Sequence, residues 1–103
     1  MRFIIEAKIP VENGNNKITN NSLTGIISAY LTDIKPEAAY FVLKNGQRTI
    51  FAIINLEAAH KLPATLEPLW LDLNCDIQMY PTMVFEDLQK AGPDLESILK
   101  KRK

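Results

Sequence analysis

The chain has 103 residues, of which 47% are hydrophobic and 23% are charged. This composition is typical of a globular protein, and the length allows one hydrophobic core, so we expect a single domain over residues 1–103. Twelve basic residues balance twelve acidic residues. This balance removes the positive field with which nucleic-acid-binding and membrane-surface proteins attract their partners, and we expect neither partner.

The first ten residues, MRFIIEAKIP, carry charges at Glu6 and Lys8 and are too polar for a signal peptide or a membrane span. We therefore expect a cytoplasmic protein. Cys75 is the one cysteine and His60 the one histidine. These counts exclude an internal disulfide and a cluster of thiolate or imidazole ligands, so we expect no metal and no cofactor.

Residues 2–9 alternate between apolar and mixed side chains, which is the period of a β-strand. Pro10 ends this strand. The stretch 11–21 is rich in Asn, so we expect a loop or a broken first helical turn there. Ser22 is the expected N-cap of the next helix.

A helical period follows over residues 23–34 and ends at Lys35-Pro36. Residues 38–44 and 47–55 are rich in β-branched and aromatic side chains. The dipeptide Asn45-Gly46 between them is typical of a type I′ turn and predicts a tight hairpin. The spacing therefore predicts a strand, a helix and a β-hairpin in this order.

Residues 57–73 have helical spacing, but Pro63 and Pro68 remove backbone donors, so we expect an interrupted helix with prolines at kinks or in first turns. Residues 75–83 alternate again, and Pro81 indicates an edge strand or a strand end. A short helix pair split at Gly92-Pro93 follows. The order β, α, β, β, α, β with a helical tail predicts an α+β ferredoxin-like fold with a four-stranded antiparallel sheet.

The turn at Asn45-Gly46 also sets the strand register, because it places Tyr40 opposite Phe51 and Phe41 opposite Ile50. Directly opposite residues share a face of the sheet. One face is then apolar throughout, and we expect the two long helices to cover it. Its residues are Phe3, Ile5, Ala7, Ile9, Phe41, Leu43, Ile50, Ala52, Ile54, Ile77 and Met79.

The other face, called the mixed face below, combines apolar and polar side chains. Its residues are Ile4, Glu6, Lys8, Tyr40, Val42, Thr49, Phe51, Ile53, Gln78 and Tyr80. Full burial of the four apolar members Ile4, Val42, Phe51 and Ile53 would contribute on the order of 10 kcal/mol. No segment is left to cover them, so we expect these four residues to form the interface of a homodimer, in which two sheets make a dimeric α+β barrel.

The chain resembles the dimeric α+β barrel superfamily, and within it small members of about this length without an assigned activity. The resemblance covers nearly the whole chain and rests on Pro36-Glu37-Ala38-Ala39-Tyr40-Phe41, Asn45-Gly46-Gln47-Arg48-Thr49, Glu67-Pro68-Leu69-Trp70-Leu71, Leu73-Asn74 and residues 83–91. Better-understood relatives are muconolactone isomerases and the monooxygenases of antibiotic synthesis and heme degradation. The resemblance implies the fold and the dimer, and it carries over no catalytic residue.

Candidate site residues are the polar side chains of the mixed face. Glu6 and Lys8 suit either a general base with an electrostatic partner or an ion pair that lines the barrel. Tyr40, Gln78 and Tyr80 suit either the orientation of a small polar aromatic ligand or packing at the interface. Trp70 lines a cleft between helix and sheet or serves as a core or interface aromatic.

Two functions fit this pattern. The first is a homodimer that is structural or binds a small, largely apolar molecule in the barrel or beside it. The second is a cofactor-independent isomerase or monooxygenase that acts on a small aromatic substrate, with Glu6 and the two tyrosines as its polar groups. An enzyme needs an enclosed cavity with a titratable group, whereas an interaction module can fill the same space with side chains.

Overall fold

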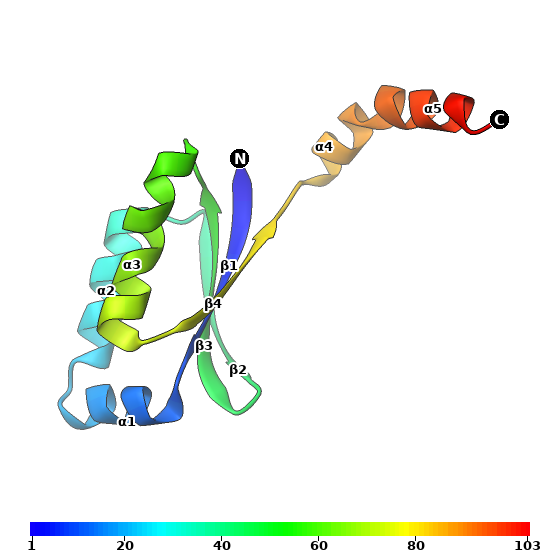
Figure 1. Cartoon of the computed structure of the whole chain (residues 1–103). Coiled ribbons are helices and arrows are strands. Elements are labelled where there is room, and N and C mark those ends of the chain that lie inside the picture. The colour runs from blue at the N-terminus through cyan, green and yellow to red at the C-terminus, as the bar shows by residue number, and fades with distance from the viewer.

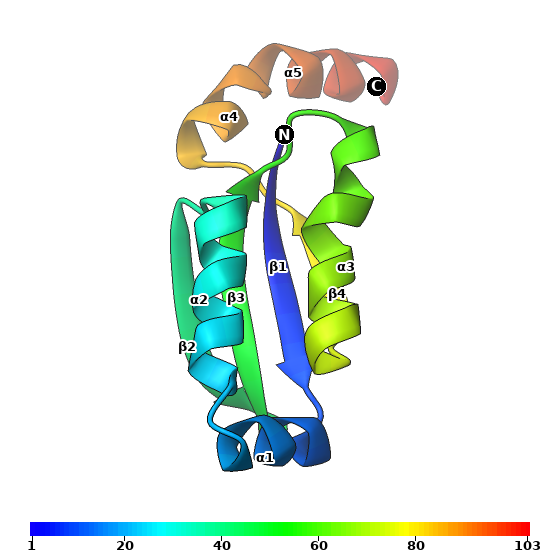
Figure 2. The same cartoon turned by 90° about the vertical axis from the view of Figure 1, so that its left-hand side faces the viewer.

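The computed structural model describes all 103 residues and contains one antiparallel sheet with the strand order β2-β3-β1-β4. The strands are β1 (Arg2–Ile9), β2 (Ala38–Lys44), β3 (Gln47–Asn55) and β4 (Asp76–Pro81). Helices α2 (Leu23–Ile34) and α3 (Leu62–Leu73) lie side by side on one face of the sheet (Figure 2), and the other face is bare (Figure 1). The predicted α+β ferredoxin-like fold is confirmed.

The predicted hairpin is confirmed in both its turn and its register. Asn45 and Gly46 have φ angles of 53° and 73°, as a type I′ turn requires. Tyr40 pairs with Phe51 and Phe41 pairs with Ile50. β4 pairs with β1 alone and is an edge strand, as Pro81 indicated.

The hydrophobic core lies between the sheet and the two long helices. Tyr30 of α2 reaches across to α3, where its hydroxyl donates a hydrogen bond of 2.7 Å to the carbonyl of Thr65. The buried members of the core are Ile5, Ala7, Ile9, Ile50 and Ile54 from the sheet and Leu23, Tyr30, Leu66, Leu69, Leu73 and Cys75 from the helical side. The assignment of the apolar face to the helices is therefore correct for β1 and β3, and also for β4, whose Ile77 and Met79 are half-buried and pack against this core.

The prediction of a loop at residues 11–21 is wrong, because a regular helix, α1 (Val11–Thr19), lies there across the end of the sheet (Figure 2). Gly14 approaches the guanidinium of Arg48 so closely that a β-carbon would clash with it. Arg48 also donates a 3.2 Å hydrogen bond to the amide oxygen of Asn15. This tertiary contact outweighs the weak helix propensity of the asparagines.

Two further expectations need correction. Ser22 stands at the N-cap position of α2, but its hydroxyl bonds to the side chain of Asn20 and does not cap the helix. The segment 57–73 is not an interrupted helix, since a 3-10 turn, η1 (Ala59–Lys61), leads into one continuous α3. Pro63 lies in the first turn of α3, whereas Pro68 lies inside the helix.

The helices leave the outer strand β2 uncovered on their own side of the sheet. Phe41 and Leu43 belong to the helix-facing side but are 60% and 78% exposed. The expectation that the two helices cover the whole apolar face is therefore wrong at this edge. The result is the α2–β2 groove, which is lined by Leu23, Ile27, Leu31, Phe41 and Leu43.

Residues 83–103, called the C-terminal arm below, leave the end of β4 and project away from the sheet (Figure 1). The arm contains α4 (Phe85–Lys90) and α5 (Gly92–Lys101), which are divided near Gly92-Pro93 as predicted. All hydrogen bonds of these residues stay within the arm. None of the helices in the chain has the length and hydropathy of a membrane span.

We predict opposite effects for alanine at two glycines that both have open space around them. Gly46→Ala should lower the free energy of unfolding by about 1–2 kcal/mol, because residue 46 has a positive φ. Gly25→Ala should raise it by about 0.5–1 kcal/mol, because Gly25 lies in α2 without such a constraint. Urea unfolding at one protein concentration measures both. Equal effects of the two substitutions would contradict the assigned turn.

Candidate functional site

The mixed face is organised in rows that run straight across the four strands. Tyr40, Phe51, Glu6 and Gln78 form the central row in the order of the strands. The row on one side contains Ala38, Ile53, Ile4 and Tyr80, and the row on the other side contains Val42, Thr49, Lys8 and Asp76. All predicted lining and interface residues except Trp70 therefore lie on this one face.

Glu6 lies at the centre of the mixed face and is only 2% exposed. Its Oε1 accepts a 2.7 Å hydrogen bond from Lys44 Nζ and a 3.0 Å hydrogen bond from the hydroxyl of Tyr80. Lys8 Nζ lies 4.0 Å from the other carboxylate oxygen, Oε2. We call these four side chains, Glu6, Lys8, Lys44 and Tyr80, the Glu6 cluster. Its hydrogen bonds and ion pairs compensate the cost of burying the Glu6 charge.

Lys44 is the member of the Glu6 cluster that the sequence interpretation missed. Its side chain runs diagonally from the end of β2 and brings Nζ to 5.6 Å from the centre of the Phe51 ring. Thr49, which is also on the mixed face, is 2% exposed. The alternation of β2 already placed Lys44 on the mixed face, but the direction of a long flexible side chain cannot be derived from that pattern.

The three hydrogen-bonded groups of the cluster shift one another's titration. The hydrogen bond from Lys44 lowers the pKa of Glu6, and this effect outweighs the burial that opposes it. The same bond raises the pKa of Lys44. The bond to Glu6 raises the pKa of Tyr80. At neutral pH these three groups are therefore a carboxylate, an ammonium and a neutral phenol, so Glu6 is a hydrogen-bond acceptor and a weak base.

The other predicted site residues lie outside this cluster. Tyr40 and Gln78 are exposed in the row of Glu6 but share no side-chain hydrogen bond with it. Trp70 belongs to α3, on the opposite side of the sheet, and is 43% exposed. No three side chains of His, Cys, Asp or Glu gather closely enough to hold a metal ion.

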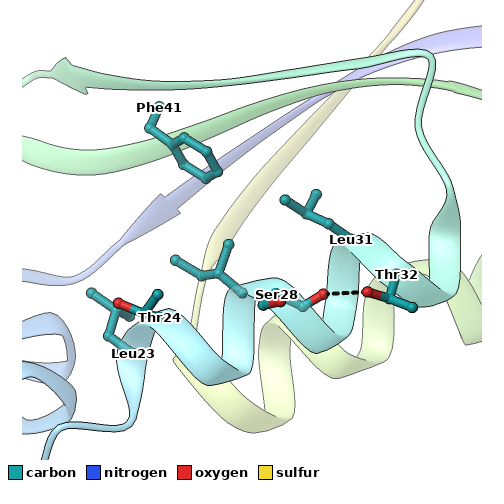
Figure 3. A pocket seen from close by; sticks show the side chains of 7 residues that line it. Leu23, Thr24, Ser28, Leu31, Thr32 and Phe41 are labelled. Carbon is teal, nitrogen blue, oxygen red and sulfur yellow. Dashed lines mark hydrogen bonds between the residues drawn. The ribbon is translucent and has the colours of Figure 1, made fainter.

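A second concave feature, the α2–β2 groove, was not predicted from the sequence. Phe41 lies over the side chains of α2 in Figure 3, and the part of the groove between Phe41 and α2 has a volume of about 570 Å³. Three hydroxyl side chains, Thr24, Ser28 and Thr32, belong to its lining. The hydroxyl of Thr32 donates to the carbonyl of Ser28 (2.9 Å) and so is already occupied. The groove is thus open and largely apolar, and Arg48, which pairs with Leu43, is the one charged side chain of its lining.

We predict that Glu6→Gln lowers the free energy of unfolding at pH 7 by about 1–3 kcal/mol, because two donors lose a charged acceptor. The pKa of Glu6 is lower in the folded chain than its ordinary value of 4.5. Its contribution is therefore present above pH 4.5 and is lost as the pH falls through the folded pKa.

Urea unfolding of the wild type and the variant at pH 7 and pH 3.5 tests this pH dependence. The difference between them should shrink at the lower pH. Glu67→Gln is the control, because Glu67 is exposed on α3 and has no ion pair. Equal free energies of unfolding of the wild type and Glu6→Gln at pH 7 would contradict a stabilising role of the Glu6 carboxylate.

Comparisons with known proteins support the fold and assign no activity. No family model and no curated protein matches the chain. Among solved structures, the chain is similar to 5-chloro-2-hydroxyhydroquinone dehydrochlorinase from Burkholderia phenoliruptrix in complex with 2,5-dihydroxybenzoquinone. The two proteins are 16% identical with a TM-score of 0.63, over 84% of this chain and 98% of the dehydrochlorinase chain. At this identity the similarity shows a shared fold alone.

Proposed function

We propose that the chain is a single ferredoxin-like domain that forms a homodimeric α+β barrel and binds a small, largely apolar molecule between the two mixed faces. The observation that carries this proposal is the Glu6 cluster, a buried charged group on an otherwise bare sheet face. Buried charges are costly unless they are paired, and a packed structural interface is better served by apolar side chains. A polar cluster among apolar neighbours is typical of a ligand site.

The cluster has hydrogen-bonding capacity to spare for a ligand. Lys44 has three N–H donors and uses one of them on Glu6, and its side chain is 42% exposed. The Tyr80 oxygen donates to Glu6 and can still accept. Phe51 and Ile4 beside them offer apolar surface. The best fit is a small flat molecule with carbonyl or hydroxyl oxygens on its ring, and the quinone in the similar dehydrochlorinase structure belongs to this class.

The homodimer needs more contact than the mixed face alone provides. Ile4, Phe51 and Ile53 are already half-buried in the single chain, and Val42 is 40% exposed. Their remaining burial would contribute a few kcal/mol, on the order of 3 rather than 10. Association also costs several kcal/mol in lost freedom of motion. The mixed face therefore sets the geometry of the proposed dimer, and further apolar surface is needed to hold it.

A second function, a cofactor-independent isomerase or monooxygenase for a small aromatic substrate, is favoured by one observation. A carboxylate and a phenol share a hydrogen bond in the Glu6 cluster, and such a pair can exchange a proton with a substrate. The lowered pKa of Glu6 works against a base at this position. Binding that draws Lys44 away from Glu6 would raise that pKa, because the Lys44 hydrogen bond is its main cause.

We predict that the wild type at micromolar concentration has twice the chain mass of 11.6 kDa in light scattering. Val42→Glu should weaken the dimer at least tenfold, because the new charge lies in the proposed interface between the mixed faces. Val11→Glu is the matched control, since Val11 is 49% exposed on α1. A monomeric wild type would remove the barrel from the proposal.

We also predict that hydroquinone or 2,5-dihydroxybenzoquinone shifts the amide resonances of Glu6, Phe51 and Tyr80 in the full chain. Lys44→Met should weaken this binding at least tenfold, because it keeps the side-chain length and removes the ammonium. Lys61→Met is the control at an exposed lysine of η1. Shifts elsewhere on the surface would contradict the site, and conversion of the probe would favour the enzyme.

A further inference from the structure

The C-terminal arm has an apolar surface that nothing in its own chain covers. Seven large apolar side chains of the arm are 44% or more exposed: Met83, Val84, Phe85, Leu88, Leu95, Ile98 and Leu99. Its helices α4 and α5 have six and ten residues. Isolated helices below about 12–15 residues are marginal in water, so these two need a surface to pack against.

The size and shape of the chain show how much surface is left uncovered. The radius of gyration is 17.5 Å, whereas a compact domain of this length has about 13 Å. The accessible surface is 7251 Å², whereas a compact monomer of this mass has about 5,800 Å². If each of two chains buried this surplus, the dimer would bury about 2,800 Å² of accessible surface in total, which falls in the range of obligate homodimers.

The α2–β2 groove is the apolar surface that matches α5. A helix of ten residues is about 15 Å long, close to the length of α2 that lines the groove. Leu95, Ile98 and Leu99 of α5 have the i, i+3, i+4 spacing of a helix that lies in a groove. Phe41 and Leu43 on the opposite wall are exposed. The groove therefore offers apolar contacts that a helix of this pattern can use.

The topology indicates which copy of the groove the arm can reach. β4 and β2 are the two opposite edges of the sheet, and the arm leaves β4 away from the body (Figure 1). Its own groove lies at the far edge. When two sheets pack face to face about a two-fold axis along the strands, β4 of one protomer comes beside β2 of its partner. The arm then leaves β4 beside the partner's edge strand β2, whose helix-facing side forms one wall of the partner's groove.

We propose that the two protomers exchange C-terminal arms, so that α5 of each one lies in the α2–β2 groove of the other. This inference rests on the proposed homodimer and specifies its symmetry and its main apolar contact. The occupant of the groove is a second copy of this chain. The arm thereby covers Phe41 and Leu43, which the chain's own helices leave bare.

A cysteine pair tests the exchange directly in the full chain. Ser28→Cys lies in the groove, and Leu95→Cys, Ile98→Cys or Leu99→Cys lies on the apolar side of α5. Oxidation should link different chains and give a covalent dimer on a non-reducing gel. Ser28→Cys with Ser97→Cys is the control, because Ser97 is on the other side of α5. The native Cys75 is buried, and its thiol pKa is raised to about 12, so it should not compete.

A pair of leucine variants tests the groove. Leu43→Glu and Leu71→Glu change leucines that are 78% and 79% exposed, but only Leu43 lines the groove. Leu43→Glu should raise the dimer dissociation constant at least tenfold, and Leu71→Glu should leave it within about threefold. Far-ultraviolet circular dichroism of both variants checks that the fold persists.

Each outcome separates this inference from the homodimer itself. A wild-type dimer in which the cysteines link within one chain or do not link, and in which both leucine variants behave alike, would overturn the exchange and leave the homodimer standing. A monomeric wild type would overturn both. Resonance shifts at Ile27 and Phe41 on addition of hydroquinone would show a groove open to small molecules and would also overturn the exchange.

Discussion

A sheet has two faces, and this chain has enough helix to cover most of one of them. α2 and α3 pack on β1 and β3 and bury a core of eleven residues. The same two helices do not extend over β2, and no element lies on the mixed face. The shortage of covering layers produces the three open surfaces of the chain: the mixed face, the α2–β2 groove and the C-terminal arm.

The position of Glu6 shows how the sequence specifies which side of β1 faces the helices. Its neighbours in β1, Ile5 and Ala7, are buried in the helix-facing core. A slip of one residue in strand pairing would move the carboxylate into that core and move isoleucines outward. Such a slip would leave a charge without Lys44 and Tyr80 as partners. The hydrogen bonds of Glu6 therefore favour the observed pairing of β1 over a slip by one residue, and the same bonds form the candidate site.

The sequence was sufficient for features that depend on local rules. Asn45-Gly46 has the backbone preference of a tight turn, and this turn sets the register that places Tyr40, Phe51 and Glu6 in one row. The sequence was insufficient where tertiary contacts determine the local structure. Helix α1 forms although its asparagines disfavour it, because it packs on Arg48 at the end of the sheet.

The burial of the mixed face could not be predicted either, because it also depends on tertiary contacts between side chains. Alternation placed Lys44 on this face but did not show that it reaches Glu6 and lies near the Phe51 ring. Ile4, Phe51 and Ile53 are half-buried in the single chain, before any partner arrives. Alternation also assigned Phe41 to the helical side of the sheet. Whether Phe41 is covered depends on where α2 packs, and the alternation of β2 does not determine that position.

The proposed ligand site and the proposed arm exchange support each other physically. An interface that depended on the mixed face alone would have to fill the barrel with side chains, since only close packing would give enough apolar contact. Arms that hold the two protomers from outside remove this requirement. The barrel interior can then keep space around Lys44 and Tyr80 without loss of the dimer. A polar cluster that would weaken a packed interface is compatible with a dimer whose apolar contacts lie elsewhere.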